Sequence, residues 1–136
     1  MPRKVVSILV GAMIAATAII AWAQTAPRRP PVHVAIVTDG SSERVDALRA
    51  SFLEELRAVN RGEFDIQAPA NLQVDADRTL TGVRAALERV LADPQTDVIV
   101  TLGVLASHAA AQRANLPKPV VAPLVANPKL QGLPYK

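Results

Sequence analysis

Hydrophobic positions follow two different periods along this chain. Residues 32–37 form a nearly continuous apolar run, VHVAIV, and residues 97–102, DVIVTL, form another. Runs of this kind are typical of parallel strands that are covered on both faces. Residues 64–68, FDIQA, alternate apolar and polar side chains, which predicts a strand with one wet face at the edge of a sheet. Residues 119–125, PVVAPLV, predict a fourth strand, with Pro123 near its end.

Between these runs, apolar residues recur at helical spacing, which predicts three helices. The first helix follows the polar turn at 38–42 and ends near Gly62, and either Ser41 or Ser42 can cap its start. Its apolar face is formed by Val45, Leu48, Phe52, Leu56 and Val59.

The other two predicted helices flank the third strand. One is capped by Asp75 or Asp77 and ends at Pro94, because proline cannot continue a helix. The other runs from about 104 to 115, is rich in alanine, and begins directly after Gly103. The third strand therefore opens at Gly103 onto a helix, which is a ligand-facing corner in many α/β folds.

The alternation of strands and helices predicts an α/β fold with a parallel sheet of about four strands and helices on both faces. The wet strand belongs at the edge, so the expected strand order is 2-1-3-4. This is a flavodoxin-like arrangement. Ligands bind such sheets at the carboxyl ends of the strands, where the order reverses, so loops 38–42 and 103–107 are expected to meet there.

The N-terminal segment has the pattern of a secretory signal peptide. Arg3 and Lys4 precede an apolar run at 5–23 that ends in Ala-Trp-Ala, a small-x-small cleavage site. We expect residues 1–23 to be cleaved and the protein to be periplasmic. The alternative is an uncleaved membrane anchor, because about 20 apolar residues span a bilayer. Residues 24–31, QTAPRRPP, then form a proline-rich leader to an α/β lobe at 32–136.

Composition excludes several classes of protein. The chain has 15 basic and 12 acidic residues, and removal of 1–23 takes away two of the basic ones, which leaves a charge near +1. Nucleic-acid binding is not expected, because there is no basic stripe and there are few aromatic residues for stacking. The absence of cysteine excludes disulfides and a lipid anchor attached through cysteine.

Each of the two loops places polar groups at the start of a helix. The first loop carries Asp39, Ser41 and Ser42, and the second carries Gly103 and Ser107. Backbone N–H groups at a helix start bind a carboxylate or another anionic oxygen, and glycine lets a ligand approach the backbone closely. On the alternative interpretation, the glycines only permit tight turns and the serines only cap helices.

Catalytic chemistry has little support. Ser107 follows Gly103 by four positions, so the nucleophile-elbow spacing is not met, and His108 lies one helical step away from that serine. His33 stands in a strand, where a satisfied or sheet-end histidine is the expectation. Two histidines without cysteine do not predict a zinc site, and loop 38–42 lacks the glycine spacing of nucleotide sites. We expect no enzyme activity, no metal and no cofactor.

Three segments together resemble a known family. They are VAIVTDG at 34–40, DVIVTLGVLASHAAA at 97–111 and LPKPVVAPLVANP at 116–128. The chain resembles the ABC-transporter substrate-binding proteins of the type 1 periplasmic-binding fold, in the branch that includes tryptophan- and other amino-acid-related binders. The resemblance implies an N-terminal lobe that captures a small solute and delivers it to an ABC permease in the membrane. By the same resemblance, the ligand-facing positions are Thr38, Asp39, Ser41, Ser42, Gly103, Leu105, Ser107 and Asn127.

Two departures from the family pattern change the expectation. Val104 and Leu105 stand where the family often has more polar residues, which indicates an apolar portion of the solute or a different ligand. The chain also stops where the family's crossover to a second lobe begins, so we expect a C-terminally truncated lobe. Its fourth strand would be an unpaired edge prone to self-association. The alternative is a stand-alone periplasmic interaction module that docks on an envelope protein.

Overall fold

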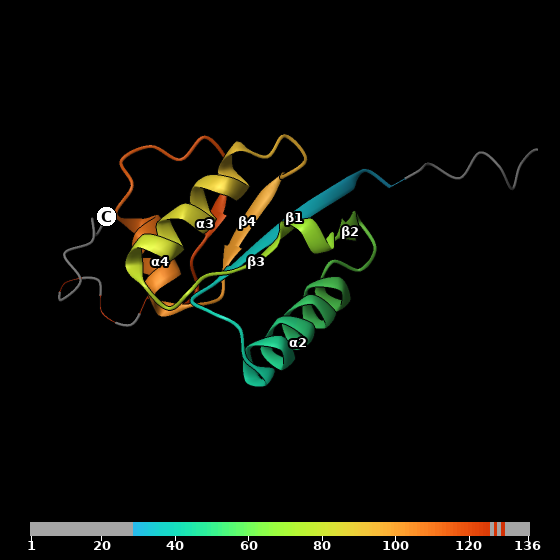
Figure 1. The fold of residues 1–136 in the computed structure, drawn as a ribbon. Helices are drawn as coiled ribbons and strands as arrows, with labels where there is room; N and C mark the ends of the chain where they lie inside the picture. Colours follow the sequence, from blue (N-terminus) through green and yellow to red (C-terminus); the bar gives the residue numbers. More distant parts are fainter. Residues whose placement is uncertain (1–28, 126, 128, 130–136) are drawn as a thin grey trace, which may run out of the picture.

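The computed structural model describes residues 29–125, 127 and 129, and within them a five-stranded parallel sheet carries helices on both faces (Figure 1). The predicted α/β class is confirmed. The strand order is β2-β1-β4-β5, with β3 also paired to β1, which corresponds to the expected order 2-1-3-4. In chain order the elements are β1 (Pro31–Thr38), α2 (Glu43–Val59), β2 (Asp65–Gln67), the 3-10 helix η1 (Ala70–Leu72), β3 (Gln73–Asp75), α3 (Leu80–Ala92), β4 (Val98–Thr101), α4 (Val104–Ala111) and β5 (Val120–Val121).

The edge of the sheet next to β1 is made of two short strands where one was predicted. β2 pairs with the first residues of β1, Pro31 to His33, and β3 pairs with its last, Ile36 to Thr38. Pro69 and η1 interrupt the edge between them, since proline has no N–H to donate to a ladder. The sequence pattern that indicates β3 is the alternation of apolar and polar residues at 72–75, in which Leu72 and Val74 are both buried.

The opposite edge is shorter than predicted. β5 pairs with β4 through Val120 and Val121 alone, although the sequence predicts a strand at 119–125. Alternate residues of a parallel strand turn their N–H groups toward the same neighbour. After Val121 the next such position is Pro123, which has no N–H, so the ladder ends there. Helix α4 likewise ends at Ala111, earlier than the expected 115.

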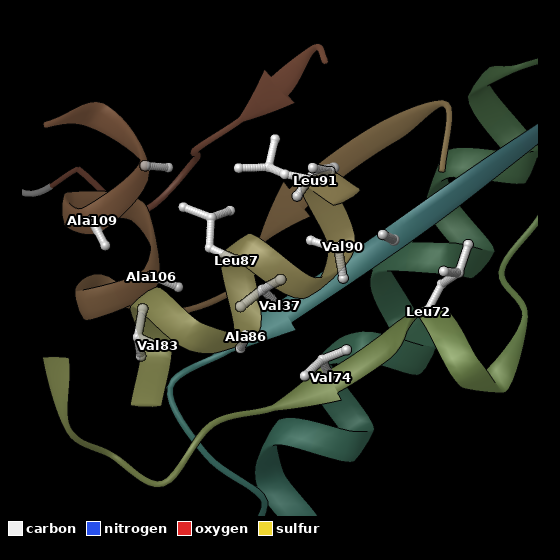
Figure 2. Close-up of a cluster of buried hydrophobic side chains, with 13 residues drawn as sticks. Val37, Leu72, Val74, Val83, Ala86, Leu87, Val90, Leu91, Ala106 and Ala109 are labelled. Carbon is white, nitrogen blue, oxygen red and sulfur yellow. The ribbon is translucent and has the colours of Figure 1, made fainter. Parts of the chain in front are cut away.

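One face of the sheet packs against α3 and α4, and it holds the larger core cluster (Figure 2). Helix α3 buries its apolar stripe except for Leu80, which is partly buried. Helix α4 approaches closely through alanines, whose small side chains bring its backbone near the sheet. The buried members of this cluster are Ala35, Val37, Leu72, Val74, Val83, Ala86, Leu87, Val90, Leu91, Ile99, Ala106, Ala109 and Ala110.

The other face of the sheet is covered by α2, and the core there is less completely buried. Val34, Ile36, Val100 and Leu102 are buried there, and the α2 side chains that pack on them are only partly buried. No residue of α2 is fully buried. Leu48 and Val59, which belong to its predicted apolar face, remain 45% and 75% exposed. None of the helices between residues 29 and 125 has the combined length and apolar character needed to cross a bilayer.

Side chains cap both long helices. Ser42 caps α2 by accepting a hydrogen bond from the Val45 N–H at 3.3 Å, as predicted. The predicted caps of α3, Asp75 and Asp77, are wrong, because Thr79 is the cap and accepts from the Gly82 N–H at 3.0 Å. Asp77 instead accepts from both the hydroxyl and the N–H of Thr79. These bonds, the hydroxyl first, lower the pKa of Asp77.

A polar clasp joins the amino ends of β1 and β4. Asp97 Oδ2 accepts from the His33 N–H at 2.8 Å and lies 3.1 Å from His33 Nδ1, while the Asp97 N–H donates to the His33 carbonyl at 3.0 Å. His33 is therefore a sheet-end histidine, as expected. The hydrogen bond from its backbone N–H, followed by the one from its ring, lowers the pKa of Asp97.

Replacement of Asp97 by asparagine is expected to reduce stability in a pH-dependent way. Because the pKa of Asp97 is lowered in the folded state, its carboxylate stabilises the fold at every pH above the unfolded pKa of about 3.9. This stabilisation is lost as the pH falls through the pKa of the folded state. The side chain is half exposed. After allowance for solvent screening we therefore expect a loss of about 0.5 kcal/mol at pH 7, or roughly 2–4 °C in melting temperature.

Thermal melts from pH 7 to pH 2.5 check this expectation. The difference between wild type and Asp97→Asn should shrink as the pH falls below the unfolded pKa of about 3.9 and through the lowered pKa of the folded state. Glu54→Gln, at an exposed position of α2 without an ion pair to any described residue, is the control and should leave the profile unchanged. A pH-independent difference for Asp97→Asn would contradict the clasp.

Candidate functional site

The two loops that were expected to meet at the sheet's carboxyl edge are joined by one carboxylate. Asp39 directly follows β1, and its Oδ1 accepts from the Ala106 N–H at 2.8 Å while its Oδ2 accepts from the Leu105 N–H at 3.1 Å. Both amides belong to the first turn of α4, which follows β4. The carboxylate therefore ties the end of β1 to the start of α4.

Gly103 is required at this junction for space and not for backbone freedom. Its backbone is extended, with φ −163°, a conformation that any residue adopts. A Cβ atom at this position would lie 2.1 Å from Asp39 Oδ1 and 2.8 Å from the Asp39 nitrogen. Only a residue without a side chain lets the carboxylate reach the amides of α4.

The helix start that was expected to bind a solute anion is thus occupied by the protein's own anion. The positive end of a helix dipole stabilises a carboxylate, and Asp39 supplies it. Two amides at the start of α4, those of Leu105 and Ala106, already have their acceptor. Leu105 itself is half-buried, and its side chain packs at the margin of the larger core cluster.

Ser107 lies inside the fold. Its side chain is fully buried, its Oγ donates to the Thr101 carbonyl at 3.2 Å and it lies 3.0 Å from Thr101 Oγ1. Thr101 Oγ1 in turn donates to the Val121 carbonyl at 3.4 Å. The two hydroxyls therefore link α4, β4 and β5, and Ser107 does not reach the surface at which a solute would arrive.

Thr38 is also fully buried, at the last position of β1. Its Oγ1 donates to Asp75 Oδ1 at 2.6 Å and lies within 3.3 Å of the Gly40 carbonyl. Asp75 ends β3, and the same carboxylate oxygen accepts from Arg49 of α2. This chain of contacts anchors α2 to the sheet at its carboxyl edge.

A third loop, which follows β3, belongs to the same edge. The Ala76 N–H donates to the Thr38 carbonyl at 3.1 Å, and the Arg78 N–H donates to the Asp39 carbonyl at 2.6 Å. Arg78 Nη2 also donates to the Ser41 carbonyl at 2.7 Å. Gly40 lies directly under this side chain, because a Cβ there would be 2.7 Å from Arg78 Cγ.

Sequence reasoning placed neither Asp75 nor Arg78 in the site. The available signal was the alternating segment at 72–75, because Asp75 is its last residue and Arg78 follows in the next loop. The remaining predicted positions are Ser41 and Ser42, which are exposed in loop 38–42, and Asn127. Asn127 is exposed as well.

The described residues form no cluster of metal ligands. Among them, no three His, Cys, Asp or Glu side chains gather where they could hold a metal ion. Two open hollows, of about 550 and 580 Å³, lie away from these loops. One is at the start of β1, lined by residues that include Asp65 and Gln67, and the other is at the end of α2, lined by residues that include Val59 and Glu63.

Gly103→Ala is expected to destabilise the fold by displacing Asp39 from the start of α4. Loss of two hydrogen bonds to a charged group predicts about 2–3 kcal/mol, measured as the free energy of unfolding in urea. Asp39→Ala removes the displaced carboxylate in advance. The double variant should therefore cost clearly less than the sum of the two single variants. Strict additivity would show that the glycine and the carboxylate do not act on each other.

Ser107→Ala separates a structural role from a binding role. The substitution removes a buried hydroxyl from its contacts with Thr101, which predicts a loss of about 1–3 kcal/mol in the free energy of unfolding. Since the hydroxyl is enclosed, any solute affinity measured by calorimetry on folded protein should stay unchanged. A variant with normal stability and weakened solute affinity would overturn this assignment.

Three loops at the carboxyl edge of the sheet, after β1, β3 and β4, are thus fixed to one another by Asp39, Asp75 and Arg78. Comparison of the chain with protein-family models, with curated proteins and with solved structures finds no match.

Proposed function

We propose that this chain is the solute-binding component of an ABC-type uptake system and captures a small organic solute in the periplasm. The proposal takes the solute to bind at the carboxyl edge of the sheet, above β1 and β4. In doubly wound sheets this is the position where ligands bind, because the loops on the two sides of the switch point diverge there.

The observation that carries the proposal is the joint made by Asp39. This joint holds the loops after β1 and β4 in one fixed arrangement before any solute arrives, and preorganised loops lose less conformational entropy on binding. Ser41 and Ser42 stay exposed beside the joint and offer hydroxyl groups to a solute. Val104, the first residue of α4, is 48% exposed and offers an apolar surface at the same edge of the sheet.

Export and delivery to a permease are inferred from the sequence. The signal-peptide pattern at 1–23 lies outside the described residues and supports export. The resemblance to substrate-binding proteins supports delivery of the solute to a membrane permease. No nucleophile and base pair is assembled among the site residues described above, so the proposed role is capture of the solute and not its conversion.

A second candidate is an interaction module that docks on an envelope protein or on a second copy through β5. The observation that favours it is the exposure of apolar side chains beside this edge, where Val121 is 50% and Leu124 is 40% exposed. Strand addition there is restricted to a short stretch, since Pro119 and Pro123 bound the strand. Co-purification of a partner that Val121→Lys abolishes would favour this candidate.

Solute-dependent thermal stabilisation tests the leading proposal. The full chain is melted with L-amino acids, dicarboxylates, sugars and inorganic phosphate. A solute at about 100 times its dissociation constant adds about 2.7 kcal/mol, which is roughly 10–20 °C in melting temperature for a domain of this size.

Ser41→Tyr, in the loop, and Ser51→Tyr, at an exposed position of α2, form a matched pair of variants. The first should abolish the stabilisation and the second should preserve it. If no solute raises the melting temperature, or if both variants respond like the wild type, solute capture at this edge is wrong.

A further inference from the structure

The carboxyl edge of the sheet carries three aspartates, and each is satisfied by groups of the protein itself. Asp39 accepts from two amides of α4, and Asp77 accepts from the hydroxyl and N–H of Thr79. Asp75 accepts from Thr38 and is paired with Arg49. The charge of Asp39 is therefore compensated by the start of α4 and that of Asp75 by Arg49, while Asp77 has only neutral donors as partners.

Arg78 differs from these aspartates, because its charged group is held by few contacts within the described part of the protein. Among the described residues, its guanidinium forms no ion pair with any carboxylate, whereas Arg49 and Arg113 both do. Its side chain is exposed, yet it is fixed by the bond from Nη2 to the Ser41 carbonyl and by its position across Gly40. A guanidinium carries five N–H donors, so most of them remain available.

The backbone of Arg78 supports a functional explanation. Two described residues other than glycine have positive φ, Arg61 at 47° and Arg78 at 64°. Arg61 lies in the turn that ends α2, next to Gly62, where left-handed backbone is common. Arg78 precedes the Thr79 cap of α3 and lies in the turn that Asp77 closes by accepting from the Thr79 N–H, and its own N–H donates to the Asp39 carbonyl. Strained backbone of this kind is retained at sites where it positions a group for function.

We propose that Arg78 recognises an anionic oxygen group of the bound solute, as a specificity-determining residue. This inference rests on the proposed function and names the solute class as small molecules that carry a carboxylate or a phosphate. The start of α4 cannot recognise that group while Asp39 fills it. The planar guanidinium, held in place at the neighbouring loop, matches the two oxygens of such an anion with parallel hydrogen bonds.

The test compares Arg78→Asn with Arg61→Asn in the full chain. Asparagine tolerates positive φ, so both variants should keep the backbone conformation and fold, which circular dichroism and melting curves check. The probes are the standard L-amino acids, the corresponding L-amino acid amides, small dicarboxylates and inorganic phosphate. The amides lack the carboxylate, so they test whether the anion is needed for binding. Inorganic phosphate tests whether a phosphate group can replace the carboxylate.

We expect a carboxylate or phosphate probe to raise the melting temperature and the amides to fail. Arg78→Asn should weaken the affinity for that probe by about 10- to 100-fold, measured by calorimetry, while Arg61→Asn leaves it unchanged. Binding of the amides as tightly as the acids would overturn the inference and leave solute capture standing, and so would an unchanged affinity in Arg78→Asn or an equal loss in both variants. A failure of every solute in the wild type would overturn solute capture itself.

Discussion

The arrangement of the candidate site depends on one electrostatic contact, the Asp39 carboxylate at the amino end of α4. Residue 39 and the two amides it binds are 66 and 67 positions apart in the chain, so this contact fixes two distant loops at once. The helix dipole makes a carboxylate favourable there, and Gly103 provides the space for it. Because the loop after β3 donates to the Asp39 carbonyl through Arg78, the third loop is attached to the same residue.

This contact changes how charge is distributed over the edge. A free helix start would attract an anionic solute group, and the sequence alone supports that expectation for loop 103–107. Once Asp39 occupies this position, the start of α4 attracts the protein's own carboxylate, and this contact preorganises the loops. Asp75 is neutralised in a similar way by Arg49, which comes from α2. If the proposed solute is an anion, its recognition requires a cation that these internal contacts leave unpaired, and we propose that this cation is Arg78.

Much of the fold could be predicted from the sequence, because continuous and alternating apolar runs report directly on how strands are covered. The order of the strands and the meeting of loops 38–42 and 103–107 followed from them. The shortness of β5 and the division of the edge into β2 and β3 depend on single prolines, whose effect on a ladder requires knowledge of the register. The internal roles of Thr38 and Ser107 were missed, since a polar residue at a strand end gives no sign of whether it turns toward solvent or toward a buried partner.

The two faces of the sheet are unequal, and this inequality bears on how the site is held. Helices α3 and α4 bury a continuous core on one face (Figure 2), so the start of α4 has a rigid foundation. Helix α2 buries no residue completely on the other face. Its connection at the carboxyl edge instead relies on polar contacts, those of Arg49 with Asp75 and of the Ser42 cap. The loop after β1 is therefore bound tightly on the side of α4 and more weakly on the side of α2. A solute that contacts Ser41 and Ser42 would consequently move α2 more readily than α4, because packed cores resist displacement and weakly packed elements yield first.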